Sequence, residues 1–418
     1  MAIELKCSYS TISSKELMTK VIPDYCIESP VDCLFWERGS NDTYLLRSVD
    51  ARYSLRIYRH ENYPRDEIDF EVDALNYLHN NGFPVAFPIP RKSGGYVTEI
   101  TAPEGLRYVL VTAFVEGTSP EYESLDDFRL TGESVARLHQ ASEGFTTPHK
   151  KKDLDFKNFA EDSLKTIEPS LAHRPEDLET LKKYIETCRS SIQNVGEDAP
   201  DTGFCHGDVH GFNAHLHQGV LTHFDFEECG FGYRVFDLAT FKWSLASGAS
   251  GPERWASFVQ GYESVRKISE ADIELVDTFV LLRHIWLIAF HMRNAHDFGG
   301  EFTSDEYIDQ QWRRLKRLST VGIGVELKTE EEHTVVVRVV DGGSAAISKQ
   351  MSAGDRILGV GNDKNSEIVD TLNWSLNDVV DLIAGQKGTT VRLKILPANA
   401  PAKSSPKIVA LVRDKVRL

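Results

Sequence analysis

The sequence predicts an α+β protein in which a bilobal unit, with a β-rich first lobe and a helical second lobe, precedes a small β-rich domain. Three observations support this prediction. The chain alternates polar and apolar residues over 31–60, as β-strands do, and residues 96–116 form two further strand-like segments around a turn, the second of them continuously apolar. Residues 252–317 have helical periodicity. After residue 318 the sequence changes to short β-rich segments with glycine-containing turns. We therefore expect lobes over about 1–116 and 117–318, and a separate domain over 319–418.

Composition narrows the classes of function. The chain has 418 residues and a formal net charge of −16, which argues against nonspecific binding to nucleic acid or to anionic membranes. Its six cysteines form no C-x-x-C pair, so they are expected to be reduced thiols. The N-terminus has no basic start followed by an apolar core, and no apolar run reaches membrane-spanning length. These features favour a cytoplasmic protein.

The first lobe is expected to be a sheet with one helix. Strands should occupy much of 31–60, with a turn at Gly39-Ser40-Asn41. Over 66–78, apolar residues recur at helical spacing, and Pro64 just before them is typical of a helix start.

Residues 204–240 contain the pattern that indicates chemistry. Asp208 and Asn213 lie in H-G-D-x-x-x-x-N, and Asp225 follows in D-F-E after an apolar, strand-like run. This spacing is typical of phosphoryl transfer, which needs positioning and charge neutralisation. A loop carboxylate such as Asp208 can accept the proton of an attacking hydroxyl. Mg²⁺ prefers oxygen ligands, which Asn213 and Asp225 would supply. The alternative is that these are polar loop residues with capping and turn roles.

This stretch resembles the aminoglycoside phosphotransferase/choline kinase-like family, whose pattern is H-G-D-x-H-x-x-N, an apolar strand, D-F/W-D/E, and then D-L-A. The matching residues are His206, Gly207, Asp208, His210, Asn213, Asp225, Phe226, Asp237, Leu238 and Ala239. The resemblance implies a bilobal, protein-kinase-like fold and a phosphotransferase that uses ATP and Mg²⁺. It also implies that His206 and Asp237 support the catalytic loop. His210 and Glu227, which belong to these two motifs, are candidates for substrate contact.

The resemblance also implies a phosphate-binding cation in the first lobe. In kinase-like folds a cation on the third strand contacts the phosphates and pairs with a helix glutamate. Many family members have lysine there, but the only lysine between residues 21 and 149 is Lys92, in a turn. Arg56 is therefore expected to hold the phosphates. Glu71 is its expected partner and Glu67 the competing choice, while an ordinary surface arginine is the alternative.

Two other segments of the first lobe are nucleotide-binding candidates. The turn with Ser40 could lie over the phosphates, although one glycine is a poor phosphate loop and an ordinary hairpin turn is the alternative. The apolar run 108–117 resembles the family's interlobe hinge, so a free backbone edge near Ala113 and Val115 could bind adenine. The choice of ATP over GTP rests on the resemblance.

In the second lobe, residues 130–141 resemble the first helix of the family's C-terminal lobe, and His139 in it is expected to be structural. The run 279–293 is apolar nearly all round and should be a buried helix. Such helices line the acceptor pocket in the family, so Arg283 and His284 are substrate candidates. The alternative is that each is a paired core residue.

Residues 319–418 resemble a PDZ domain, most closely that of C-terminal (tail-specific) processing proteases. Four segments carry this resemblance: 322–327, 343–346, 352–360 and 376–380. A helix should begin after Ser375, which has the N-cap position with an acidic residue three later. No Ser/Lys protease dyad region follows, so proteolysis is not expected.

A PDZ domain binds a peptide as an added strand and holds its terminal carboxylate in a nest of backbone N–H groups. Gly322, Ile323, Gly324 and Val325 would form that nest. Leu376 and Val379 would contact the last side chain of the peptide.

Three hypotheses follow. The first is an ATP- and Mg²⁺-dependent phosphotransferase that acts on a hydroxyl of a small molecule. The second is a kinase for a peptide or protein whose C-terminal tail is captured by the PDZ domain, which would raise its effective concentration at the site. The third is a non-catalytic scaffold with a kinase fold. The complete set of Asp208, Asn213 and Asp225 argues against the third.

Overall fold

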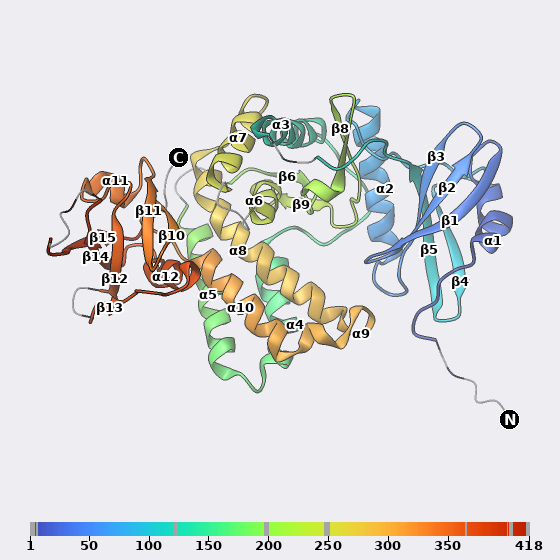
Figure 1. Ribbon diagram of the computed structural model, residues 1–418. Coiled ribbons are helices and arrows are strands. Elements are labelled where there is room, and N and C mark those ends of the chain that lie inside the picture. The colour runs from blue at the N-terminus through green and yellow to red at the C-terminus, as the bar shows by residue number, and fades with distance from the viewer. Residues whose placement is uncertain are drawn as a thin grey trace. The chain divides into compact units, whose positions relative to one another are not determined.

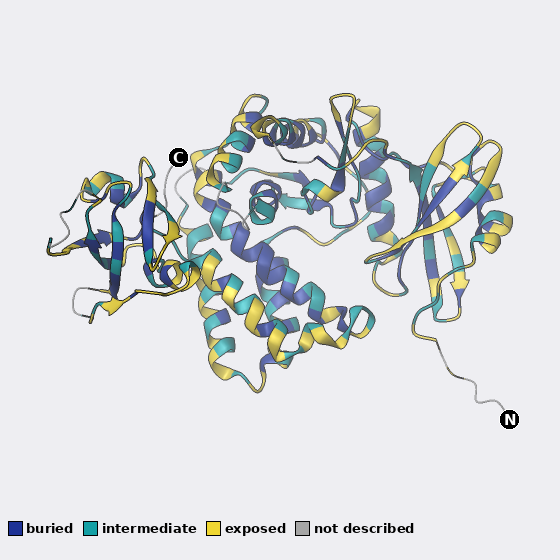
Figure 2. Ribbon diagram, in the orientation of Figure 1, coloured by how far each residue is buried: buried dark blue, intermediate teal, exposed yellow. Residues whose placement is uncertain are grey.

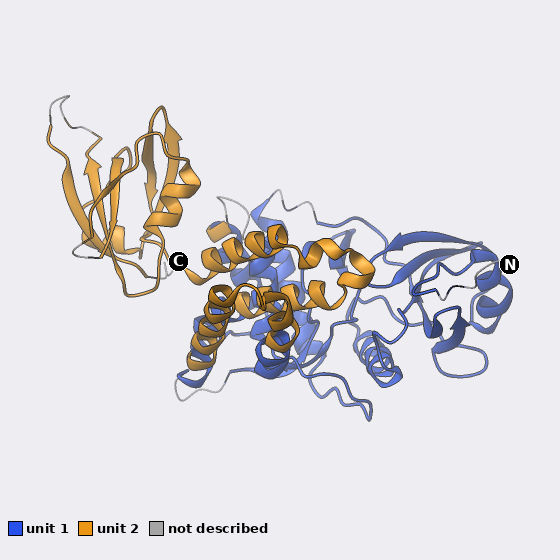
Figure 3. Ribbon diagram, turned by 90° about the horizontal axis from the view of Figure 1, so that it is seen from below, with its two compact units in different colours: residues 1–163, 191–246, 253–279 blue, residues 164–190, 247–252, 280–418 orange. Residues whose placement is uncertain are grey.

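The structure, a computed structural model, describes the chain except for short gaps (Figure 1). The described residues are 5, 7–120, 122, 124–195, 200–245, 251–363, 366–398, 400 and 404–414. They divide into two units, which Figure 3 distinguishes by colour. The first unit contains residues 1–163, 191–246 and 253–279, and the second contains residues 164–190, 247–252 and 280–418.

The first unit begins with an antiparallel five-stranded sheet in the order β1-β2-β3-β5-β4. Its strands are β1 (Pro30–Arg38), β2 (Asp42–Ser48), β3 (Arg52–Ile57), β4 (Val97–Ala102) and β5 (Gly105–Ala113). The short helix α1 (Ser14–Glu16) precedes them. The strands and turns expected over 31–60 and 96–116 are therefore confirmed.

Helix α2 (Arg65–Asn80) joins this sheet to the rest of the first unit. On one side Ile68 and Val72 pack against Tyr58, just after β3, and Leu110 of β5. The opposite side of α2 packs into a second cluster, which belongs to the second lobe. That cluster includes Phe70, Ala74, Leu75, Leu78, Phe145, Phe204 and Phe226. Because α2 is apolar on two sides, it fixes Glu71 between the two lobes.

The second-lobe part of the first unit combines helices with two small sheets. Its helices are α3 (Leu125–Ala141), α6 (Val235–Leu245), α7 (Gly251–Glu263) and the start of α8 (Glu270–Arg293). Strand β6 (Thr202–Cys205) pairs with β9 (Gly230–Tyr233), and β7 (Ala214–His217) pairs with β8 (Val220–His223). Helix α3 begins before the expected residue 130 because Ser124 and Asp127 form a capping box.

The second unit begins with helices. They are α4 (Ser163–Ile167), α5 (Pro175–Gln193), the remainder of α8, α9 (Ala295–Phe298) and α10 (Asp305–Ser319). Figure 2 shows the middle of α8 as buried, and Leu282, Ile285 and Ile288 have no exposed surface. The buried helix expected over 279–293 is thus confirmed. Among the described residues no helix is both long and apolar enough to cross a membrane.

The C-terminal part of the second unit is a six-stranded sheet in the order β10-β11-β12-β14-β15, with β13 paired to β12. The strands are β10 (Val325–Glu330), β11 (His333–Val339), β12 (Arg356–Asn362), β13 (Val369–Asp370), β14 (Thr390–Leu396) and β15 (Lys407–Val412), and the helices are α11 (Ser344–Ser348) and α12 (Leu376–Ile383). Ser375 caps α12, accepting a hydrogen bond from the Asp378 N–H at 3.2 Å. The expected start of this helix is therefore confirmed.

Candidate active site

The loop after β6 brings Asp208 and Asn213 together. Asn213 Nδ2 donates to the backbone carbonyl of Asp208 at 3.0 Å and to its carboxylate at 3.1 Å. Gly207 has φ +84°, and a Cβ there would lie 2.1 Å from the carbonyl oxygen of Glu228. Only glycine therefore allows the loop to pass so close to the segment after Asp225.

Asp225 follows β8 and joins the same group. The Phe224 N–H donates to the Asn213 carbonyl at 3.1 Å, which ties the end of β8 to the loop. Asp225 itself has φ +64°, an uncommon left-handed conformation that turns the chain sharply. Burial raises the pKa of its carboxyl, Arg56 lowers it and Asp208 raises it, with a net increase. The three residues singled out from the sequence thus lie at one place.

Arg56 on β3 bridges this group to α2. Its guanidinium donates to Glu71 at 2.9 Å and to Asp225 at 2.8 Å. Tyr58 also donates its hydroxyl to Glu71, at 2.8 Å. Glu71 is buried, whereas Glu67 is only half-buried. The structure therefore pairs Arg56 with Glu71, as expected, rather than with Glu67.

Sequence reasoning missed the apolar residues on the same sheet face as Arg56. Leu34 is paired directly with Leu45, and Leu45 with Ser54. Ser54 lies two residues before Arg56 on β3, so both side chains point to one face. Leu34 and Leu45 therefore form an apolar surface beside the cation, of the kind that can cover an adenine ring. The alternation of β1 and β2, placed in register with Arg56, is the signal that could have found them.

The turn at 39–41 contacts Glu227. The Ser40 hydroxyl and the Asn41 amide both donate to the Glu227 carboxylate. Asn41 also accepts from the Arg59 N–H at 2.9 Å. Burial and the charge of Asp225 raise the pKa of Glu227 to about 8. The expectation that Glu227 contacts substrate is corrected, because this buried carboxylate is held by the first-lobe turn. Ser40 likewise directs its hydroxyl to Glu227.

The expected free backbone edge at the hinge is only partly present. The Ala113 N–H donates to the Phe87 carbonyl at 2.9 Å, so this residue has no free donor for an adenine. The carbonyl of Val115 accepts from His215 Nδ1 at 2.9 Å. In the described part of the chain, no backbone acceptor is recorded for the Val115 N–H. The Ala113 N–H is therefore not available to an adenine, whereas the Val115 N–H is, and the adenine contact of this edge stays a prediction.

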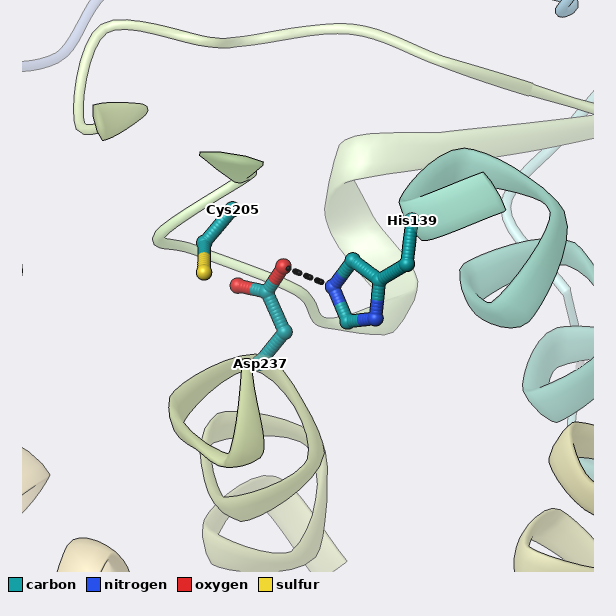
Figure 4. Close-up of side chains that lie close together, drawn as sticks. All are labelled: His139, Cys205 and Asp237. Carbon is teal, nitrogen blue, oxygen red and sulfur yellow. Dashed lines mark hydrogen bonds and ion pairs between the residues drawn. The ribbon is translucent and has the colours of Figure 1, made fainter. Parts of the chain in front are cut away.

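Asp237, at the start of α6, contacts the backbone of the loop that carries Asp208. Its carboxylate accepts from the N–H groups of His206 and Gly207, both at 2.8 Å, and faces His139 Nε2 at 2.9 Å (Figure 4). Burial alone would raise the pKa of Asp237, but His139 and these N–H groups keep it below its usual value. His206 Nε2 also lies 3.1 Å from the Phe224 carbonyl. These contacts agree with a supporting position for both His206 and Asp237.

Cys205 lies beside this pair, and the three side chains are close enough to be considered as metal ligands. Both nitrogens of His139 already have partners, since Nδ1 lies 2.8 Å from the Tyr262 hydroxyl. Burial also raises the pKa of the Cys205 thiol well above its usual value. The cluster is therefore a hydrogen-bonded support of the loop.

Among the substrate candidates, His210 is the one for which the described residues show a contact with the Asp208 carboxylate. Its Nε2 is 3.2 Å from Asp208. Arg283 and His284 are both buried in the second unit. Arg283 lies over the Trp286 ring, at 4.5 Å from its centroid, and His284 Nε2 is 3.3 Å from the Gln311 carbonyl. The expectation of substrate contact is corrected for Arg283 and His284, which are enclosed among helices.

The C-terminal sheet presents a second candidate site. Gly324 has φ +77° and lies just before β10. Among the described residues, no backbone acceptor is recorded for the N–H groups of Ile323 and Gly324, as a carboxylate nest requires. Leu376 is half-buried on α12, but Val379 has no exposed surface and packs in the core. The predicted peptide contact of Val379 is therefore corrected. The neighbouring Val380, 41% exposed, faces outward.

Comparison with known proteins identifies the larger part of the chain. Residues 34–272, more than half of the sequence, match the phosphotransferase enzyme family. The chain belongs to this family. An uncharacterized protein of Synechocystis sp. is 33% identical over 318 residues, which cover 75% of this chain and 87% of that protein. A homoserine kinase of Phenylobacterium zucineum is 23% identical over 299 residues, which cover 69% and 87%.

A solved structure supports the same fold. An amicoumacin kinase in complex with AMP-PNP and Ca²⁺ superimposes with a TM-score of 0.60 and 20% identity, covering 73% of this chain and 92% of that one. The kinase-like α+β fold expected from the sequence is thus confirmed. Together with the family match, the comparisons confirm that the chain is a phosphotransferase with an alcohol group as acceptor.

The last part of the chain matches a different family. Residues 311–396 match the PDZ domain. A tail-specific protease of Haemophilus influenzae is 43% identical over 101 residues, which are 24% of this chain and 14% of that protein. The expected resemblance to the PDZ domain of such proteases is therefore confirmed, and the phosphotransferase also carries a PDZ domain.

Proposed function

We propose that this chain transfers the γ-phosphate of ATP to a hydroxyl group of a small molecule in a Mg²⁺-dependent reaction. The observation that supports this most directly is the grouping of Asp208, Asn213 and Asp225 beside the Arg56 guanidinium. The group combines carboxylates, which can hold a divalent cation, with a guanidinium that can contact phosphate. That combination suits a reaction in which negative charge must be bound and neutralised.

The residues present fit a divalent cation. Asp208, Asp225 and Glu71 place three carboxylates in one region. Burial is the largest cause that raises the pKa of Asp225, Arg56 lowers it, and the charges of Asp208 and Glu71 raise it further. A hard cation would relieve this repulsion. In this proposal Asn213 and Asp225 hold Mg²⁺, which would neutralise charge on the phosphate oxygens when bound.

The side chains then have separate tasks. Asp208 accepts a hydrogen bond from the acceptor hydroxyl and takes its proton while the new O–P bond forms. The bond from the γ-phosphorus to the bridging oxygen breaks, and ADP leaves with that electron pair. Arg56 contacts the phosphates, and Glu71 keeps its guanidinium in place at 2.9 Å. The Val115 N–H and the Leu34–Leu45 surface bind the adenine.

An amino alcohol is the first acceptor class to test. Homoserine kinase is among the relatives, and its name indicates an acceptor with both a hydroxyl and an ammonium group. The net charge of −16 favours a cationic acceptor. The chain would be incubated with ATP, Mg²⁺ and a panel of amino alcohols that includes homoserine, and products identified by mass spectrometry through the added phosphate.

Two variants provide the contrast. Asp208→Asn should lower product formation by about 10²- to 10⁴-fold, as expected when a general base is removed. Asp153→Asn changes an exposed aspartate of the same unit and should leave the rate within twofold. Equal rates in the wild type and Asp208→Asn would contradict the role of Asp208. A wild type that forms neither ADP nor product would instead indicate the non-catalytic scaffold.

A peptide acceptor is the second candidate, and the outward position of Val380 favours it. With Leu376, this side chain makes an apolar strip on α12, in the same domain as the N–H groups of Ile323 and Gly324. The strip would take the last side chain of a peptide whose carboxylate meets those N–H groups.

Peptides with a free or an amidated C-terminus distinguish this candidate. A serine-containing peptide with an apolar last residue should be phosphorylated faster when its carboxylate is free. Val380→Glu should remove the advantage, whereas Val412→Glu, at a valine 50% exposed on β15, should preserve it. Equal rates for both peptide forms would contradict the peptide hypothesis and favour the small-molecule reaction.

A further inference from the structure

The chain contains three consecutive lysines, 150–152, after α3, and only the middle one turns inward. Lys150 and Lys152 are exposed, whereas Lys151 is half-buried. The Lys151 ammonium donates to the backbone carbonyl of Glu227 at 2.5 Å. One lysine of the run therefore contacts the D-F-E segment that contains Asp225.

The surroundings of Lys151 are acidic. Burial lowers the pKa of Lys151, but the nearby Cys229 thiol and the Glu71, Glu228 and Glu67 carboxylates raise it above its usual value. The ammonium is therefore charged at neutral pH. It places a second cation, besides Arg56, in the region of the Glu71 carboxylate.

The conformation of the D-F-E segment, residues 225–227, depends on contacts with other parts of the chain. Asp225 has the left-handed φ of +64°, which a non-glycine residue adopts only when its surroundings hold it. Phe226 packs in the core, and its carbonyl accepts from the Cys229 N–H at 3.0 Å. Beyond it, the Glu227 carboxylate is held by the first-lobe turn and the Glu227 carbonyl by Lys151. The two anchors come from different parts of the chain, the turn at 39–41 and the segment after α3.

The segment that carries Lys151 is itself fastened to α2. The Tyr77 hydroxyl donates to the Glu143 carbonyl at 2.6 Å. Asp66 at the start of α2 faces His149 Nδ1 at 2.8 Å and accepts from the Lys150 N–H at 2.7 Å. Lys151 thus links the helix that carries Glu71 to the turn that carries Asp225.

We propose that Lys151 is a positioning residue of the phosphotransfer site, which holds the Glu227 carbonyl so that the left-handed Asp225 stays directed toward the metal position. This inference rests on the proposed Mg²⁺-dependent reaction. In this proposal Lys151 acts through the Glu227 carbonyl rather than on the nucleotide or the acceptor. Loss of the Lys151 side chain should therefore raise the Mg²⁺ concentration that gives half-maximal ADP formation.

The test compares four variants of the full chain. Lys151→Met removes the donor and Lys151→Arg retains one, while Lys150→Met and Lys152→Met remove the same charge from the two exposed neighbours. ADP formation is measured at saturating ATP over a series of Mg²⁺ concentrations, with thermal unfolding as the check on folding. Lys151→Met should raise the half-saturating Mg²⁺ concentration at least tenfold. Lys151→Arg should restore it to within threefold of the wild type, and the neighbours should remain within twofold.

Three results would overturn the proposal. One is a half-saturating Mg²⁺ concentration in Lys151→Met within twofold of the wild type. Another is an equal shift in all three methionine variants, which would reveal only an effect of total charge. The third is unfolding of both Lys151 variants, which would make the residue structural. If the wild type forms no ADP, the proposed function fails by itself. Mn²⁺ binding, followed by electron paramagnetic resonance, then decides: unchanged affinity in Lys151→Met refutes the positioning role.

Discussion

Gly207 offers a sharp test of how tightly the catalytic loop is packed. In Gly207→Ala the new Cβ would lie 2.1 Å from the Glu228 carbonyl oxygen, at a φ of +84°. Left-handed backbone costs an alanine about 1–2 kcal/mol. The forced shift of the neighbouring backbone adds about 1–3 kcal/mol, a typical cost of overpacking. We expect a total destabilisation of about 2–5 kcal/mol.

Gly219 is a matched control for that substitution. It has φ +80°, nearly the same as Gly207, but a Cβ there meets nothing within 4 Å. Gly219→Ala should therefore cost only the backbone strain, about 1–2 kcal/mol. Both glycines lie in the first unit, so one urea transition, followed by circular dichroism, reports on both variants. The backbone strain is common to both variants, so the difference between their free energies of unfolding measures the cost of the close contact with Glu228.

Activity should separate the two variants more strongly than stability does. The clash at Gly207 pushes on the segment after Asp225, and a displacement of about 1 Å at a reaction centre can cost about 10²-fold in rate. We expect ADP formation to fall by that order in Gly207→Ala and to stay within twofold in Gly219→Ala, measured where both proteins are folded. Equal losses of stability and of activity in the two variants would refute the reasoning from the close contact.

Three more predictions concern the first lobe. Glu71→Gln should lower the rate of ADP formation about tenfold because the Arg56 guanidinium loses a charged partner. Glu67→Gln, the control, should not change this rate. Steady-state kinetics of both variants test the prediction. Leu34→Asn should raise the KM for ATP at least threefold with kcat within twofold; an unchanged KM would remove this residue from the adenine surface. The hydrogen bond to Asp66 raises the pKa of His149, so its stabilisation is present below pH about 6.5 and is lost as pH rises through the raised pKa. The urea midpoint of the wild type should therefore fall from pH 6 to 8 relative to that of His149→Gln, and parallel curves would contradict this.

The features that the sequence predicted are those that depend on short stretches of chain. Asp208 and Asn213 are five residues apart on one loop, so their approach follows from local geometry. The pairing of Arg56 with Glu71 could be predicted for a different reason. Arg56 was the available cation for the third strand, and the family pattern, a glutamate followed by leucine four residues later, favoured Glu71 over Glu67, which projects similarly from the helix.

The features that the sequence did not predict depend on single backbone angles or on distant partners. Glu227 was expected to contact substrate, but the left-handed φ of Asp225 changes the direction of the residues that follow it. Val379 and Val380 are adjacent on a helix, where one residue rotates a side chain by about 100°; the first therefore lies in the core and the second outside. At Ala113 the missing information was its non-local partner, the Phe87 carbonyl.

The way the catalytic loop is held separates the reaction from the choice of acceptor. Asp237 secures the loop through the backbone N–H groups of His206 and Gly207, contacts that do not depend on the side chains farther along it. Residues of the loop that point outward can therefore change without moving Asp208. Phe212, directly before Asn213, is 78% exposed, its N–H donates to His210 Nδ1 at 3.2 Å, and its ring lies edge-on to the His210 ring. Because this exposed aromatic side chain lies next to His210, which contacts the proposed base, we expect substitutions of Phe212 to change the preference among acceptors.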